Sequence, residues 1–257
     1  MDKLDRYYEK FDEDKRLKRK HGEVEYFVTN FFIHQFLNDK KNKKIADIGA
    51  GTGAYSIPLF LEGYDVTAVE YVKSNLDKLR KKRSTVKTFL GDAKKLDMFA
   101  DNTFDLTLLF GPMYHSISFD EKILALSEAK RITKQNGIIM VAYYMNEYAI
   151  LTHGFKEGHI KNAIEESRID SKFHILCGDD DLYSFERIED IDKYNRVVGL
   201  SRQTIFAPDG ASDYMRETLN KMDDETFELF KKYQLSICER NDLLGASSHL
   251  VDVLKKC

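Results

Sequence analysis

A run of ten residues, from Lys44 to Gly53, constrains the fold of this 257-residue chain more than any other stretch. Residues with strand character lead into Gly49, Gly51 and Gly53, and a segment with helical character follows them. Glycines let the backbone come close to a ligand, and the first turn of a helix offers unpaired N–H groups. A strand, a glycine turn and a helix start in this order predict a ligand-binding corner.

Asp47 lies two residues before the first of these glycines, and its charge narrows the choice of ligand. In most nucleotide-binding folds the same corner binds a phosphate. A fixed negative charge repels a pyrophosphate but attracts a cationic amine or sulfonium group. The sequence therefore favours S-adenosylmethionine (SAM) as the ligand over a dinucleotide.

Strands and helices alternate through the first part of the chain. Strands are predicted at residues 45–48, 65–70, 86–90, 104–110 and 138–144. Helices are predicted at residues 54–61, 74–82 and 119–136. We expect Ser74 and Ser118 to cap the second and third of these helices, and Gly137 to end the third. Such alternation predicts an α/β fold with a doubly wound, mostly parallel sheet and right-handed crossovers.

The chain is divided into four predicted parts. They are an N-terminal helical cap (1–40), a Rossmann-like core (41–145), a helical insertion (146–182) and a C-terminal part that completes the sheet (183–257). In the first part Tyr7, Tyr8 and Phe11 lie on one helical face. A solvated tail seldom carries three aromatic residues, so we expect this arm to dock on the body, by plain packing or by closing over the cofactor.

The composition is that of an ordinary globular protein, with 42% hydrophobic and 32% charged residues. A net charge of −3 gives no global positive field for nucleic acid or an anionic membrane. The three cysteines lie far apart with no zinc-site spacing, so we expect no metal and reduced thiols. The N-terminus is too charged for a signal peptide, and no apolar run approaches membrane length. We therefore expect a cytoplasmic protein.

Two further carboxylates follow the next predicted strands. Glu70 ends the second strand, where it can accept hydrogen bonds from both hydroxyls of a ribose. Asp92 follows the third strand, where it can accept from the exocyclic amine of an adenine. Ligands of such sheets bind at the carboxyl ends of the strands. Asp47, Glu70 and Asp92 are therefore predicted to bind one ligand.

These motifs resemble those of the class I SAM-dependent methyltransferases over roughly residues 40–145. The resemblance rests on Ile45–Gly53, Val69-Glu70, Gly91-Asp92-Ala93 and Phe104-Asp105-Leu106. It implies a seven-stranded sheet whose last strand inserts antiparallel beside the fifth. It also implies that the glycine loop faces the methionine part of SAM, that Glu70 holds the ribose and that Asp92 holds the adenine amine. The predicted cofactor contacts are Asp47, Gly49, Ala50, Gly51, Gly53, Glu70, Tyr71, Asp92, Ala93, Phe110 and Gly111.

The segment Gly111-Pro112-Met113-Tyr114-His115 follows the fourth strand, beside the expected sulfonium. Methyltransferases that act on the adenine amine carry Asn/Asp/Ser-Pro-Pro-Tyr/Phe there, and Gly111 and Met113 depart from that pattern. His115 is predicted to take a proton from an amine, phenol or thiol acceptor, and Tyr114 to line the methyl path. The alternative is that both residues only shape the pocket. His249, on the predicted last strand, is expected to be structural.

The favoured function is methyl transfer from SAM to a small-molecule acceptor by in-line displacement. One alternative is a catalytically inactive module that binds SAM or S-adenosylhomocysteine (SAH) for regulation. A second is an NAD-dependent oxidoreductase, because Gly49, Gly51 and Ala54 also satisfy the permissive dinucleotide fingerprint. A nucleic-acid methyltransferase is a third, although the sequence shows no basic face for it. The sequence predicts no oligomeric state.

Overall fold

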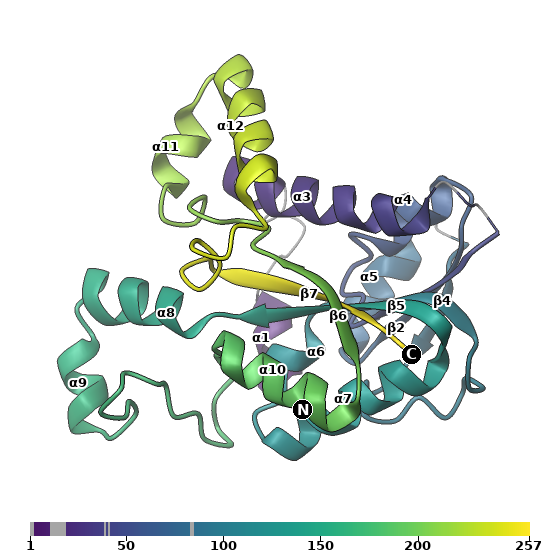
Figure 1. Cartoon of the computed structure of the whole chain (residues 1–257), viewed down its shortest axis with the longest axis horizontal. Coiled ribbons are helices and arrows are strands. Elements are labelled where there is room, and N and C mark those ends of the chain that lie inside the picture. The colour runs from purple at the N-terminus through teal and green to yellow at the C-terminus, as the bar shows by residue number, and fades with distance from the viewer. Residues whose placement is uncertain (1–2, 11–18, 39, 41, 83–84) are drawn as a thin grey trace.

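The computed structural model describes residues 3–10, 19–38, 40, 42–82 and 85–257. The strands are β1 (Lys44–Ile48), β2 (Asp65–Glu70), β3 (Lys87–Leu90), β4 (Phe104–Leu109), β5 (Thr133–Tyr144), β6 (Ser201–Phe206) and β7 (His249–Lys255). They form one seven-stranded sheet in the order β3-β2-β1-β4-β5-β7-β6 (Figure 1). The first five strands pair in parallel, and β7 is antiparallel to both β5 and β6. This order confirms the predicted doubly wound sheet with its antiparallel last strand.

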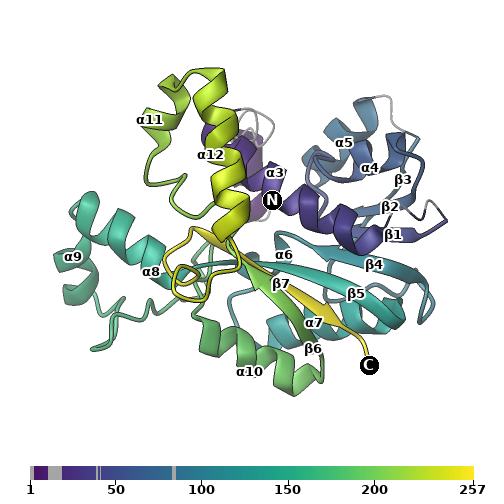
Figure 2. The same ribbon diagram turned by 45° about the horizontal axis from the view of Figure 1, so that its top comes forward.

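Helices cover both faces of the sheet, and some extend beyond its edge (Figure 1). They are α1 (Lys3–Lys10), α3 (Lys20–Leu37), α4 (Ser56–Leu61), α5 (Lys73–Lys81), α6 (Pro112–His115), α7 (Phe119–Ile132), α8 (Asn146–Ala149), the π-helix η1 (Ile150–Lys156), α9 (Ile160–Glu165), α10 (Ile188–Val198), α11 (Arg216–Lys221) and α12 (Asp224–Ile237). Figure 2 shows α3, α4 and α5 over one face and α7 and α10 over the other. Crossover helices on both faces are what a parallel sheet requires, because each of its faces is apolar.

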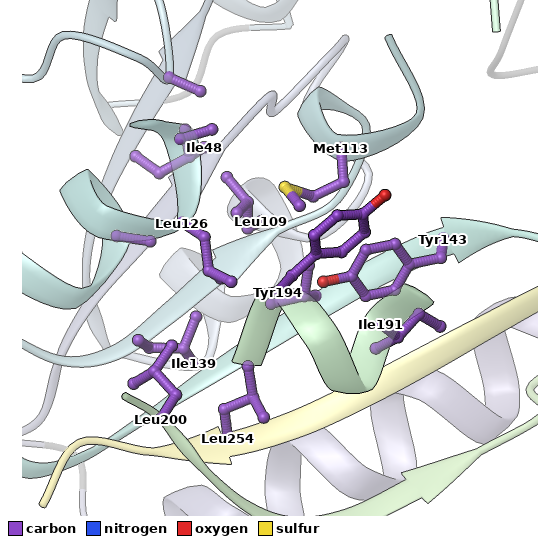
Figure 3. Packing of buried hydrophobic residues seen from close by; sticks show 14 of the residues in the cluster. Ile48, Leu109, Met113, Leu126, Ile139, Tyr143, Ile191, Tyr194, Leu200 and Leu254 are labelled. Carbon is purple, nitrogen blue, oxygen red and sulfur yellow. The ribbon is translucent and has the colours of Figure 1, made fainter. Parts of the chain in front are cut away.

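The apolar run of β5 shows how this arrangement buries the core. Ile139, Val141 and Tyr143 face α7 and α10, whereas Met140 and Ala142 face the side of α3 and α4. Successive side chains of a strand point to opposite faces, so a strand covered on both sides needs apolar residues throughout. Figure 3 shows Tyr143 beside the Tyr194 ring of α10, with the two ring centroids 6.4 Å apart.

Two of the predicted helix boundaries are wrong. Helix α5 begins at Lys73 with Val72 at its N-cap, so Ser74 lies inside the helix. Helix α7 ends at Ile132, and Gly137 lies inside β5, where the pairing with β4 is irregular. A Cβ at Gly137 would lie 2.7 Å from a Thr133 side-chain carbon, so this glycine is needed for close packing. The predicted cap at Ser118 is confirmed, since its Oγ accepts from the backbone of α7.

Several helices lie at the periphery of the sheet. Helices α8, η1 and α9 project away from the sheet, and α11 and α12 pack against α3 (Figure 1). The division of the chain into four parts stays a prediction. Within the described ranges, every helix is too short or too polar to cross a membrane.

Candidate cofactor and acceptor site

A cavity of about 650 Å³ lies at the carboxyl ends of the central strands, where the loops after β1, β2, β3 and β4 meet the end of β5. This volume is in the range of small-molecule sites, roughly 300–1,000 Å³. Every predicted cofactor residue except Gly53 lines it, as do Tyr114 and His115. Residues predicted from motifs far apart in the sequence therefore line the same cavity.

The glycine loop is held against the neighbouring strand and helix. The Gly49 N–H donates to the Val69 carbonyl at 2.8 Å, and a Cβ at Gly49 would lie 2.6 Å from Pro112 Cδ. Gly49 and Gly51 both have positive φ, and a Cβ at Gly51 would meet open space. Glycine at these positions lets the loop pass close to α6 while its backbone faces the cavity. Gly53 instead lies against Leu79, so its predicted cofactor contact stays a prediction.

Two buried carboxyl groups form the floor of the cavity. Ser56 Oγ donates to Asp47, and burial raises the pKa of Asp47 to about 6. Glu70 accepts from the backbone N–H groups of Gly51 at 2.7 Å and Val72 at 2.8 Å. Burial, and then the charge of Asp47, raise the pKa of Glu70 to about 7. A cationic ligand with hydroxyl donors fits such a floor, because it favours the ionised form of both groups.

The outer end of the cavity is more open. Asp92 is half-buried and accepts from the Lys94 N–H at 2.9 Å, while the Lys94 ammonium donates to Glu121 at 2.7 Å. Tyr71, just after β2, has 45% of its surface exposed. Asp92 follows β3 and Tyr71 follows the neighbouring β2, so both lie at the edge of the sheet where the adenine is predicted to bind.

The inner end of the cavity is aromatic. The Tyr114 ring stacks on Tyr144 with centroids 4.4 Å apart, and the His115 ring stacks on Tyr183 at 5.0 Å. The Tyr8 hydroxyl lies 2.9 Å from His115 Nε2. These rings come from α1, α6, the end of β5 and the segment before α10, so the chain folds back over its core to close the compartment.

His115 has a partner at each ring nitrogen. Its Nδ1 lies 3.0 Å from the Leu182 carbonyl, which can only accept, so Nδ1 carries the proton and Nε2 accepts from the Tyr8 hydroxyl. Burial lowers the pKa of His115 to about 4. The imidazole is therefore neutral near physiological pH, and Tyr8 must move or relay the proton before His115 can act. Its role as a base stays a prediction, as does that of Tyr114.

The N-terminal arm docks at this compartment. Lys3 donates to the backbone carbonyls of Asp179, at 2.7 Å, and of Asp181, and α1 lies against α5. Tyr7 and Tyr8 line the cavity, as the aromatic face of the arm predicted. Phe11, the third residue of that face, lies outside the described residues.

Several lining residues had no signal in the sequence. They are Lys3, Leu4, Glu25, Thr29, Asn75, Tyr183, Pro208, His249 and Val251. His249 is buried and its Nδ1 lies 2.5 Å from Asp209 Oδ2. The two residues are far apart in sequence and in no recognisable spacing, so only the fold brings them together.

Fold and site together define a class I methyltransferase-type protein: a 3-2-1-4-5-7-6 sheet with an acid-lined glycine loop at its centre. The sequence profile of the methyltransferase domain family matches residues 46–141, which contain that loop and both buried acids. Residues 46–141 therefore form a methyltransferase domain, and the sheet order around them is that of the class I SAM-dependent methyltransferases.

Curated relatives agree with this assignment. A demethylmenaquinone methyltransferase of Renibacterium salmoninarum is 35% identical over 103 residues, which are 40% of this chain and 41% of the relative. A glycine/sarcosine N-methyltransferase of Aphanothece halophytica is 23% identical over 231 residues, covering 84% of this chain and 77% of the relative. The chain thus spans less than half the length of the first relative. The names of the two relatives state different methyl acceptors.

A solved structure shares the fold along nearly the whole chain. It is a SAM-dependent methyltransferase of Thermotoga maritima, described as a possible histamine N-methyltransferase, with a TM-score of 0.58 and 18% identity. The match covers 99% of this chain and 98% of that one. Identity at this level shows a common fold and leaves the acceptor open.

Proposed function

We propose that this protein transfers a methyl group from SAM to a small-molecule acceptor by in-line displacement. The observation that carries the proposal is one cavity with two halves. One half holds the glycine loop with Asp47 and Glu70, and the other is the aromatic compartment around Tyr114. A methyl donor and its acceptor need adjoining sites of these two kinds.

The residues of the first half fit SAM by their chemistry. Glu70 offers carboxylate oxygens to the ribose hydroxyls, and Asp92 offers one to the adenine amine. Asp47 supplies negative charge beneath the loop, close to the cationic part of the cofactor. Gly49, Ala50 and Gly51 bring backbone to the methionine part. Tyr71, Ala93, Phe110 and Gly111 shape the walls around the adenosine and the sulfonium.

The second half supports a small acceptor. SAM supplies an electrophilic methyl group, so the protein needs mainly to hold the acceptor in line and keep water out. Placing two reactants correctly can supply about 7–11 kcal/mol of the barrier. The tyrosines of the compartment provide apolar surface with hydroxyl groups for orientation. With a net charge of −3, the protein offers no global field for a nucleic-acid acceptor.

Calorimetry with SAM, SAH and NAD tests the cofactor half. We expect SAM and SAH to bind and NAD not to bind. Asp47→Asn should weaken SAM binding by about 1.5–3 kcal/mol, because a charged hydrogen-bonded group is lost. Asp65→Asn is the matched control, since Asp65 is a half-buried residue at the start of β2 that is paired with Lys87 and does not line the cavity. Equal SAM affinity in all three proteins would refute the assignment of the cavity.

Methyl transfer to a metabolite panel tests the reaction itself. The panel contains amines, phenols, thiols and carbon acids, and SAH formation is the readout. Turnover with one class supports the enzyme. Tight SAM binding without turnover on the panel or on a small-molecule extract would instead favour a regulatory SAM-binding module. NAD binding with hydride transfer would favour an oxidoreductase.

A further inference from the structure

Two histidines and one glutamate lie together beside α8 and α9, the helices that project away from the sheet (Figure 1). They are His153 on η1, Glu157 directly after it and His159, the residue before α9. One possible ligand atom of each side chain lies within 4.8 Å of the other two. All three residues are exposed, and none of them lines the cofactor and acceptor cavity. The group is therefore separate from the site described above.

The backbone brings these residues together in a fixed frame. The segment η1 is a π-helix, a rare conformation that is frequent at functional sites. Gly158 follows it with a φ of +84°, which lets the chain turn back, and the His159 N–H donates to the His153 carbonyl at 3.4 Å. A Cβ at the buried Gly154 would lie 3.2 Å from Ile160 Cδ1, so η1 packs directly against the start of α9.

The distances between the three side chains suit one metal ion. Zn²⁺ binds imidazole nitrogen and carboxylate oxygen at about 2.0–2.2 Å, so two of its ligand atoms lie roughly 3–3.5 Å apart. His153 Nδ1 lies 2.9 Å from a carboxylate oxygen of Glu157, which is already close to this spacing. The ring centroids of His153 and His159 are 4.3 Å apart, with 30° between the planes. A rotation of the exposed His159 side chain brings its nitrogen to the same spacing.

An ion pair of His153 with Glu157 is the competing use of these residues. A carboxylate only accepts hydrogen bonds, so Nδ1 of His153 carries the proton between the two groups. The two side chains are 70% and 58% exposed, and such a pair contributes little to stability. It also leaves the ring of His159, beside that of His153, without a role. A metal ion would replace the shared proton and engage all three side chains.

The ligand types select the metal. Two imidazoles and one carboxylate suit Zn²⁺, Ni²⁺ or Cu²⁺, whereas Mg²⁺ and Ca²⁺ prefer sets of oxygen ligands. Charge does not compensate for this preference, because Glu157 is the one carboxylate of the group and Lys156 and Lys161 lie beside it in the sequence. The expectation of no metal rested on the spacing of the cysteines, and this group contains none of them.

We propose that His153, Glu157 and His159 form a surface site for one divalent transition-metal ion such as Zn²⁺. The side chains supply three ligands, and water completes the coordination because the site faces solvent. Two of the ligands belong to η1 and its C-cap, and the third is the N-cap residue of α9. The bound ion therefore ties the end of η1 to the start of α9. The inference goes beyond methyl transfer and does not depend on it.

Calorimetry with ZnCl₂ and, separately, with NiCl₂ tests the site in the whole chain. The wild type is compared with His153→Ala and His159→Ala. His174→Ala is the matched control, because His174 is a half-buried histidine between α9 and α10 that pairs with Asp190 at 3.4 Å. We expect the wild type to bind one ion that the first two variants bind at least about tenfold more weakly, since even the residues behind metal ligands contribute about 10–100-fold. The control should bind like the wild type, and MgCl₂ should not bind at the group.

Thermal unfolding gives a second readout. An ion that binds the folded chain raises its unfolding temperature. Zn²⁺ should therefore raise the unfolding temperature of the wild type more than that of His159→Ala. With EDTA the two proteins should unfold alike, because the substituted side chain is exposed. In crystals soaked with Zn²⁺, anomalous density between His153 and His159 would locate the ion.

Several results would overturn the proposal. One is equal Zn²⁺ affinity in the wild type and His159→Ala, and another is no heat of binding with the wild type. A third is loss of the ion in Asp209→Asn but not in His159→Ala, which would place it at Glu25, Asp209 and His249, whose ligand atoms also lie within 4.8 Å of one another. Methyl transfer is measured in a separate assay, so failure of the proposed function leaves the outcome at this site unchanged.

Discussion

SAM binding should release a proton from Glu70, and the affinity should therefore rise with pH. Without a ligand, burial and the Asp47 charge hold the pKa of Glu70 at about 7, against 4.5 for an ordinary glutamate. The ribose hydroxyls are donors and the cofactor is cationic, so both favour the ionised carboxylate. A protonated Glu70 must lose its proton before the ligand binds well.

The magnitude follows from the two protonation states. At pH 6 about one tenth of Glu70 is ionised, so deprotonation costs about 1.4 kcal/mol, which is roughly a tenfold loss of affinity relative to pH 8. Asp47, with a pKa of about 6, adds a further factor of about two at pH 6. His115, whose pKa is about 4, does not titrate in this window.

Stability without ligand should change in the opposite direction. Between about pH 4.5 and 7 the unfolded chain has lost the Glu70 proton while the folded chain keeps it. The unfolded state then binds fewer protons, so this group lowers the free energy of unfolding as pH rises through that window. Above pH 7 both states are ionised and the contribution becomes constant.

Calorimetry at pH 6, 7 and 8 in two buffers of different ionisation enthalpy measures both the affinity and the proton release. The control is Glu70→Gln, in which the α-amino group of SAM, with an ordinary pKa near 8, titrates as it does with the wild type. At pH 6 we expect release of up to about 1.4 protons in the wild type, roughly 0.9 from Glu70 and 0.5 from Asp47, and only the Asp47 share of about 0.5 in the variant. Identical pH dependence in the two proteins would refute the assigned role of Glu70.

Three further substitutions test the structure around the site. Gly49→Ala should destabilise the fold by about 1–3 kcal/mol and weaken SAM binding, because φ is +80° and the new Cβ would lie 2.6 Å from Pro112; unchanged thermal unfolding and SAM affinity would contradict the loop geometry. Lys122→Ala should cost about 3–5 kcal/mol in urea unfolding, because it leaves Glu186, 3.1 Å away, charged and buried; a loss below about 1 kcal/mol would show that the pair is dispensable. Ser118→Ala should cost about 1 kcal/mol through the lost N-cap of α7, whereas Ser118→Thr should retain most of it; equal unfolding midpoints for both would argue against the cap.

The strands and glycine turns of the cofactor-binding half were predictable from sequence, because each depends on residues that are close together in the chain. The apolar run at β4 and β5 and the glycines between strand and helix each report a structure made by neighbours in the chain. The spacing from Asp47 to Glu70 also predicts a shared edge, because parallel strands end on the same side. The errors at Ser74 and Gly137 are errors of boundary. There, Val72, whose N–H donates to Glu70, caps α5 ahead of Ser74, and the pairing of Thr133 with Phe104 begins β5 ahead of Gly137.

The acceptor half was not predictable in the same way. Tyr183 and Pro208 lie in segments without regular periodicity, and the backbone of Ser184 is held by the Tyr114 carbonyl at 2.8 Å. His249 contacts Asp209, which lies forty positions earlier in the chain. The pairing of β6 with β7 brings the two segments together. A lone histidine on an apolar strand predicts packing, and the sequence contains nothing that marks its partner.

The cofactor half and the acceptor half of the cavity are built from different parts of the chain, and this limits what relatives can indicate about the acceptor. The family profile covers residues 46–141, which supply the glycine loop, Asp47, Glu70 and the α6 residues. The walls of the acceptor compartment come also from α1, α3, the segment before α10 and the start of β7, all outside that range. Relatives that share only the core can therefore bind the same cofactor and methylate unrelated acceptors. The acceptor of this protein must be inferred from its own compartment, because apart from the α6 rings of Tyr114 and His115 most of the aromatic walls lie outside the shared core.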